Sequence, residues 1–119
     1  MPEAEAETVQ LDEEDAKLVT LARAARARIG AVEGAAVRDS DGRTYAGASV
    51  SLPSLTVTAL QLSVASAVAA GASRLEAAAV VTEASVLDGA GQAAVRDLGV
   101  GAPIHVAGPD GTVLNTVRN

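Results

Sequence analysis

Apolar side chains recur every three or four residues near the start of the chain, a spacing that places them on one face of an α-helix. We predict an amphipathic helix from Asp12 to about Ile29. Asp12 is suited to cap this helix, and the three acidic residues after it occupy the first turn, where the helix dipole favours negative charge. The apolar positions are Leu18, Leu21, Ala22, Ala25 and Ile29.

Short apolar runs bounded by turn residues predict five strands. The first two are joined through Asp41-Gly42, a step that is typical of a β-hairpin. The remaining three follow a second helix. The predicted strands span residues 34–37, 44–50, 76–82, 103–107 and 112–117.

The second helix is predicted between Pro53, which breaks the chain, and Gly71, with Ser54 as its cap. It has no charged residue, which indicates burial on several sides, against a sheet or in an oligomer. A Gly-rich turn at 88–91 leads into a short third helix at 92–98. Elements in the order α-β-β-α-β-α-β-β predict a single three-layer α/β/α domain over residues 11–119.

Negative charge is concentrated at the N-terminus. The chain has 119 residues, with 15 acidic and 9 basic side chains, and seven of the acidic ones lie in the first 15 positions. Residues 1–10 are therefore predicted to be a disordered acidic tail, and the rest lacks the basic face that nucleic-acid binding requires. No apolar run is long enough for a membrane span, and the acidic start is unlike a signal peptide. We expect a cytoplasmic protein with no nucleic-acid or membrane partner.

Candidate chemistry is sparse. Cysteine is absent and His105 is the only histidine, which excludes a catalytic thiol, a thiolate zinc site and any mechanism that needs two imidazoles. His105 lies in an apolar strand and is interpreted as a core or edge residue. Residues 89–94 match the G-x-G-x-x-[GA] dinucleotide pattern, but too late in a short domain, so a tight turn of small residues is the preferred interpretation. A phosphate or sulfate ion at this helix start stays open as an alternative.

The order and spacing of several short segments resemble the small homo-oligomeric cytidine deaminases. The resemblance covers about residues 12–117 and implies that family's fold, with a mixed five-stranded sheet. The segments are VEGAAV at 32–37, DGR at 41–43, GASV at 47–50, TAL at 58–60, AAVV at 78–81, GAG at 89–91, PI at 103–104 and GPDG at 108–111.

The resemblance also implies where catalytic groups belong. The family holds zinc through a His or Cys at the start of the second helix and two Cys at the start of the third, and a Glu two residues after the first ligand moves protons. By position, the ligands correspond to Thr58, Asp88 and Gly91, and the glutamate corresponds to Leu60. Since these residues cannot supply three ligands or a proton shuttle, we expect no deaminase activity, no metal and no other cofactor.

A remnant of the substrate pocket is predicted in place of a catalytic site. Where the family has Asn-Val-Glu to hold the ribose hydroxyls, this chain has Ser49-Val50-Ser51, which keeps hydroxyl groups but loses the carboxylate. The predicted pocket residues are Ser49, Ser51, Thr58, Leu60, Asp88, Gly89 and Gly91.

Three classes of function follow. The first is a catalytically inactive interaction or regulatory module that forms a homo-oligomer, a dimer or tetramer, through its second helix, with an unidentified protein partner as a further option. The second is a nucleoside- or nucleotide-binding module that uses the remnant pocket. The third is an enzyme of unrecognised chemistry built from Asp88, Thr58, His105 and a glutamate. A protein that is named cytidine deaminase by homology only is compatible with the first two.

Overall fold

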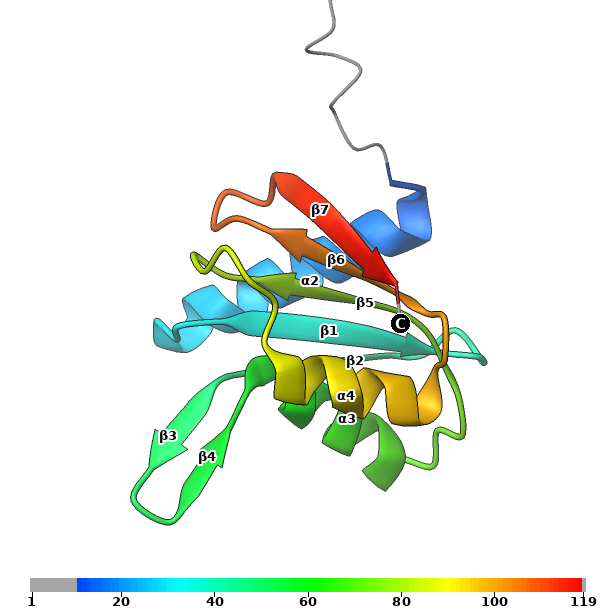
Figure 1. Cartoon of the computed structure of the whole chain (residues 1–119), viewed down its shortest axis with the longest axis horizontal. Helices are drawn as coiled ribbons and strands as arrows, with labels where there is room; N and C mark the ends of the chain where they lie inside the picture. The colour runs from blue at the N-terminus through cyan, green and yellow to red at the C-terminus, as the bar shows by residue number, and fades with distance from the viewer. Residues whose placement is uncertain (1–10, 119) are drawn as a thin grey trace, which may run out of the picture.

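The computed structural model describes residues 11–118, so the predicted acidic tail at 1–10 lies outside the described residues. Helices and strands alternate in the predicted order, with one additional hairpin (Figure 1). In chain order the elements are α2 (Glu13–Ile29), β1 (Gly34–Asp39), β2 (Thr44–Ala48), β3 (Val50–Leu52), β4 (Leu55–Val57), α3 (Ala59–Ala69), β5 (Leu75–Val81), α4 (Gly89–Leu98), β6 (Pro103–Ala107) and β7 (Val113–Arg118).

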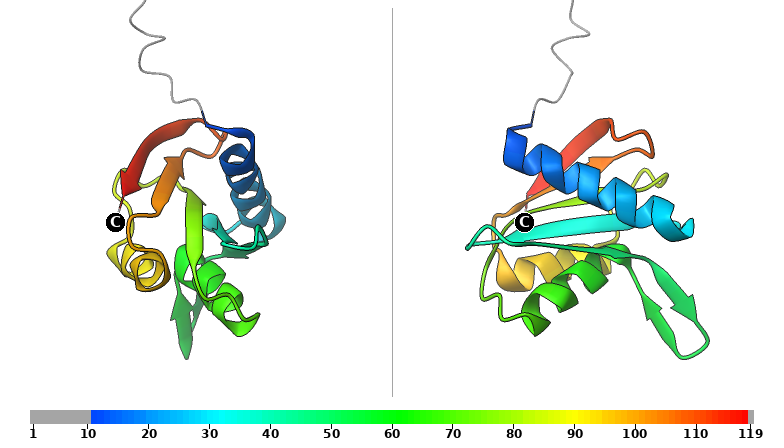
Figure 2. Two further views of the ribbon diagram at one scale, coloured as in Figure 1. Left: turned by 90° about the vertical axis from the view of Figure 1, so that its right-hand side faces the viewer. Right: turned by 180° about the vertical axis from the view of Figure 1, so that it is seen from behind.

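The main sheet has five strands in the order β2-β1-β5-β6-β7. Strands β5 and β6 are parallel, and the other neighbouring pairs are antiparallel. Helix α2 covers one face of the sheet, while α3 and α4 cover the other (Figure 2). The predicted three-layer α/β/α fold with a mixed five-stranded sheet is confirmed.

Small side chains build both cores. The central strands β1 and β5 consist mainly of buried alanine and valine residues, with Leu75 at the start of β5. The largest buried side chains on the neighbouring elements are Leu18, Leu60 and Ile104. Helix α2 lies so close to β1 that a Cβ built on Gly34 would lie 2.7 Å from the Arg26 backbone nitrogen. Glycine at this position therefore sets the distance between helix and sheet.

Two predicted helix ends are confirmed on α2. The Asp12 carboxylate accepts a hydrogen bond from the Asp15 backbone N–H at 2.8 Å, as an N-cap does. Gly30 ends the helix in the left-handed conformation, with φ of 65°.

None of the helices within residues 11–118 is long and apolar enough to cross a membrane.

The predicted β1–β2 hairpin is also confirmed, and a buried aspartate organises its turn. Asp39 accepts hydrogen bonds from the backbone N–H groups of Asp41 and Arg43, and from the Tyr45 hydroxyl at 2.7 Å. Gly42 supplies the positive φ, 88°, that the turn requires.

The second helix begins later than predicted. Residues 50–57 form the β3–β4 hairpin, with Pro53 and Ser54 at its turn, so Ser54 does not cap α3. The cap is Thr58, whose hydroxyl accepts from the Gln61 N–H while the Gln61 side chain accepts from the Thr58 N–H. The capping box fixes the start of α3 four residues after Ser54. The segment between them, Leu55–Val57, contains β-branched residues and forms a strand.

The predicted Gly-rich turn at 88–91 is wrong as well, because these residues open helix α4. The Asp88 carboxylate caps the helix by accepting from the Gly91 N–H at 2.8 Å. The cap gives the Gly91 backbone N–H a hydrogen-bond acceptor. It thereby stabilises a first helical turn that contains Gly89 and Gly91, although glycine has a low helix propensity.

Candidate functional site

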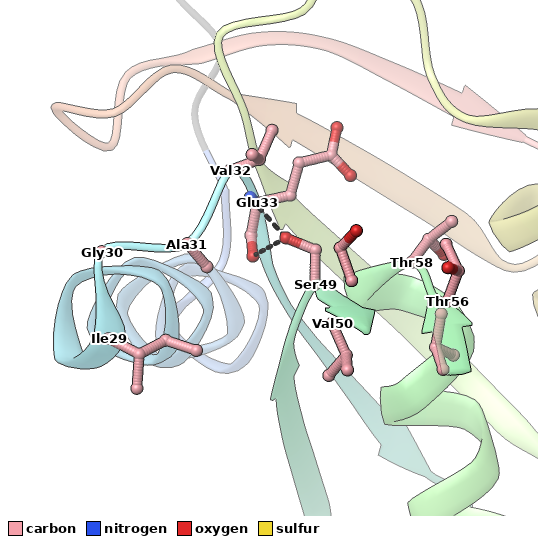
Figure 3. A pocket seen from close by; sticks show the side chains of 11 residues that line it. Ile29, Gly30, Ala31, Val32, Glu33, Ser49, Val50, Thr56 and Thr58 are labelled. Carbon is pink, nitrogen blue, oxygen red and sulfur yellow. Dashed lines mark hydrogen bonds between the residues drawn. The ribbon is translucent and has the colours of Figure 1, made fainter. Parts of the chain in front are cut away.

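A pocket of about 430 Å³ lies where the C-terminal end of α2 and the following loop approach the β3–β4 hairpin (Figure 3). This volume falls in the range of small-molecule sites, and most of the lining is apolar. The lining residues are Ile29, Gly30, Ala31, Val32, Glu33, Ser49, Val50, Ser51, Thr56, Val57 and Thr58.

Ser49 fixes the backbone at one side of this pocket. Its hydroxyl accepts from the Glu33 N–H at 3.1 Å and lies 3.4 Å from the Glu33 carbonyl oxygen. The Ser49 backbone N–H donates to the same carbonyl at 3.0 Å. The start of β1 and the end of β2 are therefore held together where the pocket begins, and Figure 3 shows the Ser49 hydroxyl between them.

Glu33 is a lining residue that the sequence-based interpretation missed. Its carboxylate oxygen Oε2 accepts from the Thr82 hydroxyl at 2.7 Å, and the Thr82 oxygen in turn accepts from the Ala84 N–H. The signal that could have identified it is its position directly before the VEGAAV glycine, at the entrance to a buried strand.

Leu60 occupies the position at which the family glutamate is implied, and it is completely buried. It belongs to the core between the sheet and the helices α3 and α4. A Cβ built on Gly91 would lie only 2.8 Å from the Leu60 Cβ. The leucine side chain and the glycine backbone thus pack directly against one another where a metal ligand and a proton shuttle would have to fit.

The other implied zinc positions use their oxygens as helix caps. The Thr58 hydroxyl and one Asp88 oxygen each accept a backbone N–H, as described above, and Gly91 has no side chain. The second Asp88 oxygen is buried without a partner among the described residues. One carboxylate oxygen beside a packed leucine does not make a zinc site, which needs three protein ligands when it is catalytic. The residues present therefore do not fit the family's zinc ion.

Within 11–118, no group of three or more His, Cys, Asp or Glu side chains is placed to hold a metal ion.

His105 lies on the face of the sheet that α2 covers, opposite the face that carries Thr58, Leu60 and Asp88. Its Nε2 faces the Asp15 carboxylate at 2.8 Å, and its Nδ1 faces the Thr116 hydroxyl at 2.8 Å. Asp15 is also paired with Arg38 at 2.9 Å, and Arg38 reaches Glu76 at 3.1 Å. The prediction of a buried core or edge histidine holds. The proposed combination of His105 with Thr58 and Asp88 is not possible, because the sheet separates them.

This network predicts acid lability. Burial raises the pKa of Asp15, but the hydrogen bond from His105 and the charge of Arg38 outweigh it, so the pKa lies below its ordinary value of 3.8. The Tyr45 hydrogen bond lowers the pKa of Asp39 in the same way. A carboxyl whose pKa is lower in the folded state adds stability above its unfolded-state pKa and loses it as the pH falls through the folded one.

We therefore expect the free energy of unfolding, measured by urea titration, to be constant near neutral pH and to fall from about pH 4 downward. Asp15→Ala should cost about 2 kcal/mol at pH 7, in the range for hydrogen bonds to charged groups. The difference from the wild type should shrink at pH 3. An equal cost at both pH values would contradict the assignment of this stability to the Asp15 carboxylate.

The structure brings together three of the seven predicted pocket residues. Ser49, Ser51 and Thr58 line the pocket, together with the α2 end and Glu33. The other four, Leu60, Asp88, Gly89 and Gly91, lie outside its lining, and the capping and packing described above account for three of them.

Comparison with known proteins places the chain in one family. The sequence model of the family described as cytidine deaminase-like matches residues 11–111. A search of curated protein sequences finds no match.

Solved structures with the same fold include cytidine deaminases of three bacteria. The enzyme from Burkholderia pseudomallei is 27% identical, with a TM-score of 0.75 over 86% of this chain and 90% of that one. The enzyme from Mycobacterium tuberculosis is 25% identical, with a TM-score of 0.65 over 82% of this chain and 85% of that one. That from Mycobacterium leprae, 23% identical, covers 90% of this chain and 94% of its own with a TM-score of 0.67, and shows the fold alone.

Proposed function

Because the chain belongs to the cytidine deaminase-like family, we propose that it is a catalytically inactive member that serves as an oligomeric interaction or regulatory module. The observation that carries the proposal is Leu60, a fully buried apolar side chain at the position implied for the proton-shuttling glutamate. A leucine can neither accept nor donate a proton, and the surrounding caps leave no ligand set for zinc. The family fold is kept while the groups that perform its chemistry are not.

Helix α3 supports the oligomeric part of the proposal. One side of it packs on the sheet and on α4 through Leu60, Ser63, Val64 and Ala67. The other side has no charged residue, and Val68 on it is 50% exposed. An uncharged helix surface next to solvent suits contact with a second copy, in line with the resemblance to homo-oligomeric enzymes.

Light scattering coupled to size-exclusion chromatography tests this interaction. We expect the wild-type chain to elute as a dimer or tetramer, and Val68→Arg to shift it toward the monomer, because the arginine charge would be buried in the contact. Val100→Arg, a matched change at a loop residue that is 84% exposed, should leave the mass unchanged. A wild-type monomer at micromolar concentration, or the same mass for both variants, would overturn the proposed contact.

The pocket favours a second candidate function, the binding of a nucleoside-sized molecule. Its volume is suited to such a ligand, and hydroxyl groups of Ser49, Ser51 and Thr58 border it. In a thermal-shift panel of nucleosides and nucleotides, a ligand at 100 times its Kd should add about 2.7 kcal/mol, which is several degrees for a chain of this size. The shift should disappear in Ser51→Trp, which places a bulky ring at the pocket. A flat panel would reject this candidate and leave the first one in place.

A further inference from the structure

The pocket has a single charged residue in its lining, and that residue is acidic. Of the 11 lining residues only Glu33 carries a charge. Arg26 approaches the same loop, but its Nε donates to the Val32 carbonyl oxygen at 3.2 Å and its Nη2 faces the Glu83 carboxylate at 3.4 Å. The arginine charge is therefore paired outside the lining, and the pocket itself carries a net negative charge.

The Glu33 carboxylate is held in place with one oxygen free. The hydrogen bond from Thr82 fixes Oε2, and Thr82 is itself buried and fixed by the Ala84 N–H. The other oxygen, Oε1, receives no hydrogen bond from the described residues and is not among their buried unpartnered atoms, so it is accessible. In Figure 3 the carboxylate stands above the Ser49 and Thr58 side chains. An oriented carboxylate with a free oxygen is ready to accept a charge-assisted hydrogen bond.

The partial charges at the helix ends beside the pocket also favour a positively charged ligand. Ile29 is the last residue of α2, and Gly30 and Ala31 follow it at the C-terminal end, where the helix dipole places partial negative charge. The positive end of α3 also borders the pocket at Thr58, but its capping box with Gln61 already occupies donors there. The fixed charges around the pocket thus favour a cation over an anion.

The rest of the lining suits an apolar body. Ile29 and Val32 are 65% and 76% exposed, although both are large hydrophobic residues at the pocket. Val50 and Val57 contribute further apolar surface from the β3–β4 hairpin. Covering such surface is favourable for an apolar ligand group.

We propose that this pocket binds a small organic cation, an amine with a compact apolar body, whose ammonium group is held by the Glu33 carboxylate. This inference rests on the pocket being a small-molecule site, which is the second candidate function. To that candidate function the inference adds that the ligand is positively charged and that Glu33 selects it. A phosphorylated ligand is disfavoured by the same carboxylate.

Three probes of similar size and different charge test the proposal: benzylamine, benzyl alcohol and benzoate. Binding to the ¹⁵N-labelled full-length chain is followed by NMR titration. We expect benzylamine to bind about 5- to 10-fold more tightly than benzyl alcohol, as a charge-assisted hydrogen bond provides, and benzoate to bind most weakly. In Glu33→Gln, which keeps an acceptor for Thr82, the preference for the amine should fall to about 1-fold.

Asp97→Asn is the matched control, because it removes an exposed carboxylate on α4 that does not line the pocket. It should leave the preference unchanged. Equal affinity of the wild type for amine and alcohol, with binding lost in Ser51→Trp, would overturn the charge selection while leaving the pocket as a binding site. Absence of binding for all three probes would overturn the proposed cation site, whereas the second candidate function falls only if the nucleoside panel is also flat.

Discussion

Replacing Gly34 with alanine is expected to destabilise the fold by about 3 kcal/mol or more, at the upper end of overpacking effects. The added Cβ would lie 2.7 Å from the Arg26 backbone nitrogen and 2.8 Å from the Arg26 Cβ, and closer still to the Ala22 carbonyl oxygen. Backbone atoms in the middle of a helix cannot move aside alone. The whole of α2 would have to shift away from β1, which exposes the core that Leu18 and Ala22 fill.

The expected measurement is a fall in Tm of roughly 10–15 °C. Gly89→Ala serves as the control, because nothing lies within 4 Å of its Cβ position and the residue opens a helix. That change should be neutral or stabilise by about 0.5–1 kcal/mol, through helix propensity and reduced chain entropy. Equal stability of the Gly34 variant and the wild type would show that α2 does not need this close approach.

Much of the fold could be predicted from the sequence. Periodic apolar positions identified α2, and alternating short runs identified the sheet strands, because each element buries a continuous stripe or face. The VEGAAV segment contains Gly34 where a helix crosses a strand. These are local rules, and α2 and the five strands of the main sheet follow them.

The β3–β4 hairpin and the start of α4 were missed for a different reason. Pro53-Ser54 is compatible with a helix start and with a turn, and local preference alone cannot decide between them. The decision comes from the Thr58–Gln61 capping box, which fixes the helix start further on. Gly89 and Gly91 likewise enter a helix because the Asp88 cap and the contact with Leu60 stabilise it there.

The pocket could be predicted only in part. Ser49, Ser51 and Thr58 followed from positions in the family pattern, whereas Glu33 and Ile29 belong to segments whose approach depends on how α2 lies across the sheet. Glu33 also supplies a carboxylate from the loop before β1, although the sequence pattern at Ser51 indicated that the pocket had lost one. The place of Glu33 beside Ser49 and Thr58 is visible only in three dimensions.

Replacing Leu60 with glutamate, the residue implied by the family, is expected to cost about 4 kcal/mol and to produce no deaminase. The side chain is completely buried in an apolar cluster, so an ionised carboxylate there would have no compensating partner. The buried, unpartnered Asp88 oxygen lies beside the same glycine, Gly91, that Leu60 packs against, and a second carboxylate in this region adds repulsion. Leu114→Glu, the same change at a residue that is 61% exposed, should alter stability by less than about 0.5 kcal/mol.

Urea unfolding gives the stability of both variants, and conversion of cytidine to uridine is followed for them and for the wild type. We expect no conversion by any of the three. A cysteine at position 91 would not restore activity, because its Cβ would lie 2.8 Å from the Leu60 Cβ. A zinc-ligating cysteine at 91 is therefore compatible only with a changed residue at 60. Cytidine turnover by the wild type would overturn the proposed inactivity. If the wild type does not turn over cytidine and the Leu60→Glu variant is as stable as the wild type, the inactivity is due to the missing zinc ligands. If the variant is destabilised, Leu60 is needed for the stability of the core.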